Sequence, residues 1–165
     1  MIEIIKAEIE QIPYIIDLAF NTWFITYEPI VGKDQTDFMF GEIYTPDSLL
    51  KQMEFFKHSF YILYVDKIPK GFASFSERPE NKEVYKLHKL YVLPTEQGKS
   101  YGKLLLQHCE VEVKKLTGNY LELNVNRYNK SKEFYEHLGY SIIREEDIAI
   151  GNYFMNDFVL QKKLF

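Results

Sequence analysis

The most informative stretch of the chain is residues 90–103, which read Leu90-Tyr91-Val92-Leu93-Pro94-Thr95-Glu96-Gln97-Gly98-Lys99-Ser100-Tyr101-Gly102-Lys103. An apolar strand runs there into a turn punctuated by glycines, and the turn opens an amphipathic helix. Such a turn aligns several backbone N–H groups at the positive end of a helix dipole, where phosphate and pyrophosphate groups bind. The stretch therefore predicts a site for a phosphorylated cofactor.

Two common phosphate-binding motifs do not fit these residues. A P-loop that ends at Gly98 needs a glycine at the position of Leu93, and Leu104 after Gly102-Lys103 offers no hydroxyl to magnesium. The dinucleotide fingerprint also fails, because Gly98 and Gly102 have the wrong spacing and no acidic ribose ligand follows roughly twenty residues on.

What remains is Gln-x-x-Ser-x-Gly, from Gln97 to Gly102, after a strand that ends in Val-x-Pro. This pattern resembles the Arg/Gln-x-x-Gly-x-Gly/Ala acetyl-CoA loop of the GCN5-related N-acetyltransferases (GNAT). A second segment, Val125-Asn126-Arg127-Tyr128-Asn129-Lys130-Ser131-Lys132-Glu133-Phe134-Tyr135-Glu136-His137-Leu138-Gly139-Tyr140, resembles the family's Val-Asn-x-x-Asn-x-Ala-x-x-Phe-Tyr-x-x-x-Gly-Phe. It follows the loop after one helix and one strand, as in the family. The resemblance implies acetyl-CoA (coenzyme A) as the cofactor and extends from about Ser59 to the C-terminus.

The resemblance and the order of expected elements imply an α/β fold of the GNAT type. We expect a mixed, largely antiparallel central sheet flanked by helices, with splayed central strands, and a single N-acetyltransferase domain over residues 1–165. Short helical pieces and loops are expected over residues 24–56, where Pro29, Gly32, Gly41 and Pro46 interrupt the pattern. One of these helices is expected to start at Thr45-Pro46-Asp47-Ser48. The other expected elements are strands over 2–7, 60–65, 71–75, 84–93, 120–125, 141–148 and 153–161, and helices over 9–23, 103–116 (ended by Gly118) and 129–138.

Composition restricts the compartment and the partners. The chain has 165 residues, of which 46% are hydrophobic, and its single cysteine excludes an internal disulfide. The N-terminus has no signal-peptide pattern and no stretch approaches the length of a membrane span. A net charge of −4 argues against nucleic acid as a partner. We therefore expect a cytoplasmic protein that binds neither nucleic acid nor membrane, contains no metal, and is a monomer or a homodimer.

The cofactor-binding residues follow from the two resemblances. Backbone N–H groups of the loop are expected to hold the pyrophosphate, and the backbone of the preceding strand to pair with the pantetheine amides. Ser100 stands where the family usually has glycine. The candidate cofactor-binding residues are Leu90, Tyr91, Val92, Gln97, Gly98, Lys99, Ser100, Tyr101, Gly102, Lys103, Asn129, Ser131 and Lys132.

Two residues are candidates for proton transfer. Tyr135 aligns with the tyrosine that commonly protonates the departing coenzyme A thiolate in this family; a tyrosine packed on the core by its ring is the alternative. Several family members have a glutamate that acts as general base on the central strand, where this chain has Lys86. The role of general base therefore does not transfer to this position. His88 lies two residues on and has an intrinsic pKa suited to accepting a proton, although a lone histidine in a strand is more often structural.

The acceptor molecule is expected to bind near the variable segment between Trp23 and Phe56. Trp23, Tyr27 and Tyr44 provide aromatic rings, and six acids stand against two bases between Glu28 and Glu54. These features favour a small cationic primary amine such as a polyamine, although a solvated helix face explains the same residues. Glu122 and Asn124 are further candidates on the acceptor side. Acetylation of a protein N-terminus or lysine, and a non-catalytic acyl-CoA-binding module, are the alternative functions.

Overall fold

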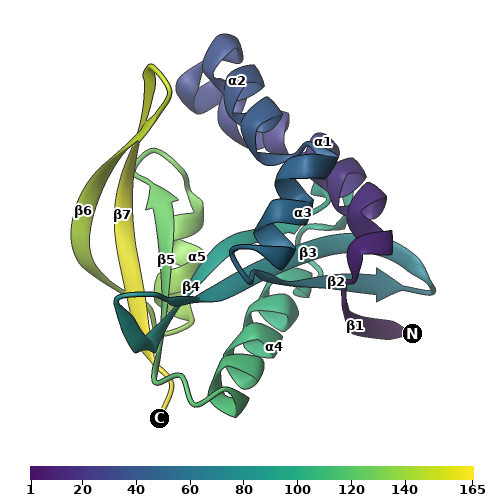
Figure 1. Cartoon of the computed structure of the whole chain (residues 1–165), viewed down its shortest axis with the longest axis vertical. Helices are drawn as coiled ribbons and strands as arrows, with labels where there is room; N and C mark the ends of the chain where they lie inside the picture. The colour runs from purple at the N-terminus through teal and green to yellow at the C-terminus, as the bar shows by residue number, and fades with distance from the viewer.

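Seven strands form one sheet in the order β1-β2-β3-β4-β5-β7-β6 (Figure 1). Every neighbouring pair is antiparallel except β4 and β5, which are parallel. The computed structural model describes residues 1–165. The strands are β1 (Ile2–Lys6), β2 (Ser59–Val65), β3 (Ile68–Arg78), β4 (Asn81–Val92), β5 (Tyr120–Asn126), β6 (Ser141–Ile150) and β7 (Tyr153–Lys163). The expected mixed, largely antiparallel sheet is confirmed.

Helices cover both faces of the sheet and divide the core in two. One cluster of buried side chains joins α1, α2 and α3 to one face, and a second joins α4 and α5 to the other (Figure 1). The helices are η1 (Ile9–Gln11), α1 (Ile12–Val31), α2 (Lys33–Ile43), α3 (Pro46–Glu54), η2 (Pro94–Glu96), α4 (Tyr101–Lys115) and α5 (Ser131–His137). None of them is both long enough and apolar enough to cross a membrane.

The expectation of short helical pieces and loops over residues 24–56 is confirmed in part: α2 and α3 are short helices, but only Gly32 and residues 44–45 separate the three helices, so the loops are wrong. Helix α1 continues through Pro29 to Val31 and ends at Gly32, whose φ of 85° lies in the left-handed region. Pro29 lies in the last turn of this helix, where it has no N–H to donate to the carbonyl of residue 25, and the helix still continues for two residues. Gly41 lies inside α2. The start of α3 is as expected, with Thr45 Oγ1 accepting a hydrogen bond from Ser48 N at 3.1 Å.

The expected role of Gly118 is also wrong. The left-handed residue that follows α4 is Thr117, with a φ of 66°. Gly118 is required instead by close packing, because a Cβ there would lie 2.5 Å from Val113 Cγ1 and 2.6 Å from Tyr85 Cδ2.

We therefore expect Gly118→Ala to lower the free energy of unfolding by about 1–3 kcal/mol, the usual cost of overpacking a core. Urea denaturation would measure it. Gly41→Ala is the matched control, because a Cβ there meets nothing within 4 Å and alanine is favoured inside a helix by about 1 kcal/mol. Equal effects of the two substitutions would contradict this account of Gly118.

The two central strands, β4 and β5, pair over a short parallel stretch and separate beyond it. Val84–Leu87 of β4 pair with Tyr120–Leu123 of β5, and no pairing continues after them. A β-bulge lies at His88, since Ser74 of β3 pairs with Lys89 and Phe75 pairs with Leu87. The splayed central strands that the sequence predicted are therefore present, and they open a gap between the ends of β4 and β5.

Candidate active site

A cavity of about 890 Å³ lies where β4 and β5 separate. Its wall consists of the ends of β4 and β5, the turn before α4, the first turns of α4 and α5, and part of α1. The size is within the range of small-molecule and cofactor sites, roughly 300–1,000 Å³.

The turn before α4 presents a row of free backbone donors to this cavity. The first hydrogen bond of α4 runs from Leu104 N to Ser100 O, so the N–H groups of residues 98–103 have no backbone acceptor. Gly98, with a φ of 83°, and Ser100, with a φ of 65°, turn the chain into the helix. Free donors at a helix N-terminus form an anion-binding site.

Eleven of the thirteen candidate cofactor residues line the cavity, and two lie outside it. Lys99 Nζ is paired with Glu96 Oε2 at 2.7 Å, and Lys132 Nζ lies 3.6 Å from Glu136 Oε1. The residues that line the cavity are Leu90, Tyr91, Val92, Gln97, Gly98, Ser100, Tyr101, Gly102, Lys103, Asn129 and Ser131. Asn129 Oδ1 also accepts a hydrogen bond from Ser131 N at 3.0 Å, which caps the start of α5.

Tyr135 reaches the cavity from α5 with a free hydroxyl. Its ring packs against Phe134 and Tyr140, at centroid distances of 5.0 and 5.9 Å, and its side chain is 8% exposed. Burial raises the pKa of Tyr135 well above its usual value. The hydroxyl therefore remains protonated at neutral pH, on a residue that lines the cavity.

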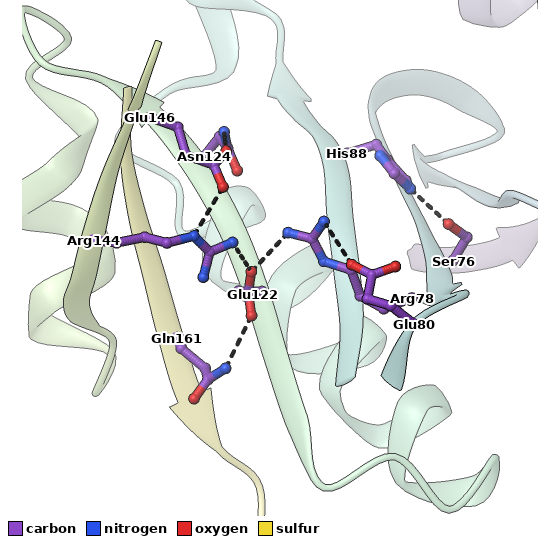
Figure 2. A network of polar contacts seen from close by, with 9 residues as sticks. All are labelled: Ser76, Arg78, Glu80, His88, Glu122, Asn124, Arg144, Glu146 and Gln161. Carbon is purple, nitrogen blue, oxygen red and sulfur yellow. Dashed lines mark hydrogen bonds and ion pairs between the residues drawn. The ribbon is translucent and has the colours of Figure 1, made fainter. Parts of the chain in front are cut away.

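His88 also lines the cavity but is held by neighbours. Its Nε2 lies 2.7 Å from Ser76 Oγ (Figure 2), and its ring stacks on that of His58, with the two ring centroids 3.9 Å apart. Burial, together with the charges of His58 and Lys89, lowers the pKa of His88 well below the usual value. The ring is thus neutral at pH 7 but a weak base, which favours a structural role.

The aromatic residues expected to meet the acceptor are divided by the fold. Tyr27 lines the cavity, and its hydroxyl lies 3.2 Å from that of Tyr91. Trp23 and Tyr44 lie outside the cavity, in the core between the sheet and α1–α3. Their rings support Tyr27 rather than face a ligand, since the Trp23 and Tyr27 centroids are 4.3 Å apart.

Glu122 and Asn124 lie on one face of β5 but have different surroundings. Glu122 is 5% exposed and outside the cavity; it accepts hydrogen bonds from Arg78 and Arg144 at 2.7 and 2.8 Å and from Gln161 at 3.0 Å (Figure 2). Burial acts to raise the pKa of Glu122, but these bonds outweigh it and hold the pKa below the usual value. Asn124 lines the cavity.

Comparison with known proteins decides the family. The sequence profile of the Acetyltransferase (GNAT) domain matches residues 29–156. The chain belongs to the GNAT acetyltransferase family. A spermidine N(1)-acetyltransferase from Thermoplasma acidophilum is 26% identical over 166 residues, covering 98% of this chain and 97% of the relative.

Solved structures of other GNAT proteins have the same fold. The PaiA N-acetyltransferase from Thermoplasma acidophilum, in complex with coenzyme A, has a TM-score of 0.82 and 27% identity over 99% of both chains. A GCN5-related N-acetyltransferase from Rhodopseudomonas palustris has a TM-score of 0.82 and 14% identity, over 98% of this chain and 94% of that one.

Among the buried ionisable residues of this GNAT domain that sequence reasoning missed are Asp157 and Lys89. Asp157 belongs to the inward face of β7, between Met155 and Val159, which are both buried. The sequence signal that could have found Asp157 is an acidic residue at a position of β7 that faces inward in the alternating pattern. Lys89, which lines the cavity, is buried because the bulge at His88 turns it towards α1–α3; its Nζ donates to Gln52 Oε1 at 2.7 Å.

Lys89 should make the stability of this GNAT protein depend on pH. Burial and then the charge of Lys86 lower the pKa of Lys89 to about 7, whereas an unfolded lysine holds its proton to about pH 10.4. The unfolded state therefore binds more protons between these values, and stability should rise with pH across that window. Lys89→Met should remove this rise, measured by urea denaturation at several pH values. Lys82→Met, at an exposed position of the same strand, should keep it, and equal slopes in the two variants would contradict the assignment.

Proposed function

We propose that this GNAT protein transfers the acetyl group of acetyl-CoA to a primary amine of a small cationic molecule, with a polyamine as the first candidate. The observation that carries the proposal is the cavity between β4 and β5, whose lining includes free N–H donors of the turn before α4 and Tyr135, a residue whose hydroxyl has no hydrogen-bond partner. The similarity to a spermidine acetyltransferase, at 26% identity, supports the polyamine.

The residues around the cavity fit coenzyme A. The N–H groups of residues 98–103 suit the two phosphates, and the side chains of Lys103 and Lys130 add positive charge in the same wall. The edge of β4 after Leu87 has no partner strand and can pair with the amides of the pantetheine arm. Acetyl-CoA bound in this way supplies an acetyl group activated as a thioester.

The chain's own residues then orient the partners and move protons. Tyr135 holds a proton on its hydroxyl and donates it to the departing sulfur. The hydroxyls of Tyr27 and Tyr91, together with Asn124, provide polar groups on the acceptor side of the cavity. The narrow space between the strands keeps the amine and the acetyl group together, which is a large part of the catalysis.

Release of free thiol from acetyl-CoA, measured against a panel of acceptors, tests this function. The panel comprises spermidine, spermine, putrescine, lysine and a peptide with a free N-terminus, and mass spectrometry of each product identifies the acetylated nitrogen. We expect the polyamines to have the highest kcat/KM. A preference for the peptide would indicate protein acetylation instead, and no amine-dependent thiol release would contradict the enzymatic function.

A further inference from the structure

Glu96 places a carboxylate in the wall of a cavity whose backbone donors suit an anion. It is the last residue of η2 and lines the cavity together with the turn that carries the free N–H groups of residues 98–103. A negative charge at this place repels a diphosphate. The carboxylate therefore needs a role that outweighs this repulsion.

Both oxygens of the Glu96 carboxylate are held by lysines from different segments of the chain. Lys70 Nζ, from β3, lies 2.9 Å from Glu96 Oε1, and Lys99 Nζ, from the turn itself, lies 2.7 Å from Glu96 Oε2. The Glu96 side chain is 12% exposed. Hydrogen bonds from Lys99 and from Lys70 hold the pKa of Glu96 below its usual value, so the carboxylate is charged at neutral pH. Glu96 thus connects the turn to the sheet.

The same strand residue also holds the start of this segment. Lys70 O accepts a hydrogen bond from Leu93 N at 2.9 Å, directly before η2. The backbone of Lys70 therefore fixes the chain where it leaves β4, and its side chain fixes Glu96 three residues later.

The turn between Glu96 and α4 has a backbone that needs such a restraint. Lys99 stands between Gly98, with a φ of 83°, and Ser100, with a φ of 65°. The left-handed conformation is unfavourable for Ser100, which has a Cβ, and its side chain makes no capping hydrogen bond. Gly98 and Ser100 are both exposed, so core packing does not fix them. The ion pairs of Glu96 are the side-chain contacts that hold this turn.

The two lysines act on the turn and not on the space inside the cavity. The lysines that line the cavity are Lys89, Lys103 and Lys130, and neither Lys70 nor Lys99 is among them. Their ammonium groups are directed to the Glu96 carboxylate.

We propose that Glu96 is a positioning residue, which with Lys70 and Lys99 holds the turn in the shape that presents its N–H groups to the diphosphate of coenzyme A. This inference rests on the cofactor site of the proposed function and names a residue that shapes it. Because the donors are arranged before the cofactor binds, binding costs less ordering of the chain.

Glu96→Gln tests the proposal through the sign of its effect on coenzyme A affinity. Charge alone predicts tighter binding, since the substitution removes an acid from the wall and releases two lysines near the diphosphate. Positioning predicts weaker binding, because the affinity falls with the fraction of molecules whose turn keeps the competent shape. We expect the Kd for coenzyme A, measured by calorimetry, to rise by about 5–10-fold. The KM for acetyl-CoA should rise equally, with kcat and the KM for spermidine unchanged.

Glu112→Gln is the matched control. Glu112 Oε1 also pairs with a lysine three residues along the chain, Lys115, at 2.7 Å, but near the far end of α4. This variant should bind coenzyme A as the wild type does. Urea denaturation of both variants measures their stability, because a merely structural ion pair would lower stability and leave the Kd unchanged.

The outcomes separate this inference from the proposed function. If Glu96→Gln binds coenzyme A as tightly as the wild type or more tightly, or if Glu112→Gln shows the same loss, the inference is overturned and the function stands. If the wild type binds coenzyme A but acetylates no amine, the function fails and the Kd values still decide the role of Glu96. If the wild type does not bind coenzyme A, both fail. Should Glu96→Gln not fold, Glu96→Asp decides by the same comparison, because it keeps the charge and is one methylene shorter than the bridge requires.

Discussion

Tyr135→Phe is expected to lower kcat by about 10²–10⁴-fold, the usual contribution of a positioned acid, and to leave coenzyme A affinity nearly unchanged. The phenylalanine keeps the packing against Phe134 and Tyr140 and removes only the hydroxyl of this cavity-lining residue. Steady-state kinetics at saturating acetyl-CoA and amine would measure kcat. Because burial raises the pKa of Tyr135, its protonated form should support activity up to at least about pH 10.

Tyr140→Phe is the matched control for this substitution. Tyr140 is also buried, but its hydroxyl donates to Glu110 Oε1 at 2.9 Å, away from the cavity. Its loss should cost about 1 kcal/mol of stability and leave kcat within a few-fold. Wild-type turnover by Tyr135→Phe would show that Tyr135 is not the acid.

Gly102→Asp is expected to weaken coenzyme A binding by roughly 100-fold or more, because it places a carboxylate beside the proposed diphosphate site. The substitution should weaken coenzyme A binding without destabilising the fold. A Cβ at Gly102 would lie 3.6 Å from Phe134 Cζ, an ordinary contact, and an acid in the first turn of a helix interacts favourably with the helix dipole. Calorimetry with coenzyme A measures the effect, and urea denaturation checks that stability is retained.

Gly102→Asn has the same size without the charge and is the control. It should weaken binding far less than Gly102→Asp. If the two variants bind coenzyme A equally, charge at this position does not matter, and the diphosphate does not lie against the first turn of α4.

The parts of the fold that the sequence predicted depend on local chemistry. The turn through Gly98 and the helix that begins at Tyr101 follow from neighbouring residues, as does the α3 start at Thr45. The continuous α1 could not be predicted from the local sequence, because Pro29 removes a helical hydrogen bond and the packing of Tyr27 and Val31 against the core supports the helix on either side of it. Gly118 was wrongly predicted to end α4; its real constraint is the Tyr85 ring of a strand.

The candidate site likewise has one side that the sequence predicts and one side that it does not. The cofactor side follows from two continuous motifs, and most of its residues line the cavity. The acceptor side is assembled from residues far apart in the sequence. Glu122 is neutralised by Arg78, 44 residues away, and by Arg144, 22 residues away. Asp157 lies beside Asn124 only because β5 and β7 pair. The sequence alone does not show which acidic side chains pair with basic side chains in the fold.

A crystal structure with coenzyme A tests the central claim most directly. The account predicts diphosphate oxygens within about 2.7–3.2 Å of backbone N atoms among residues 98–103, with the sulfur next to the Tyr135 hydroxyl. A diphosphate bound elsewhere, or a turn whose N–H groups are covered by side chains, would contradict it.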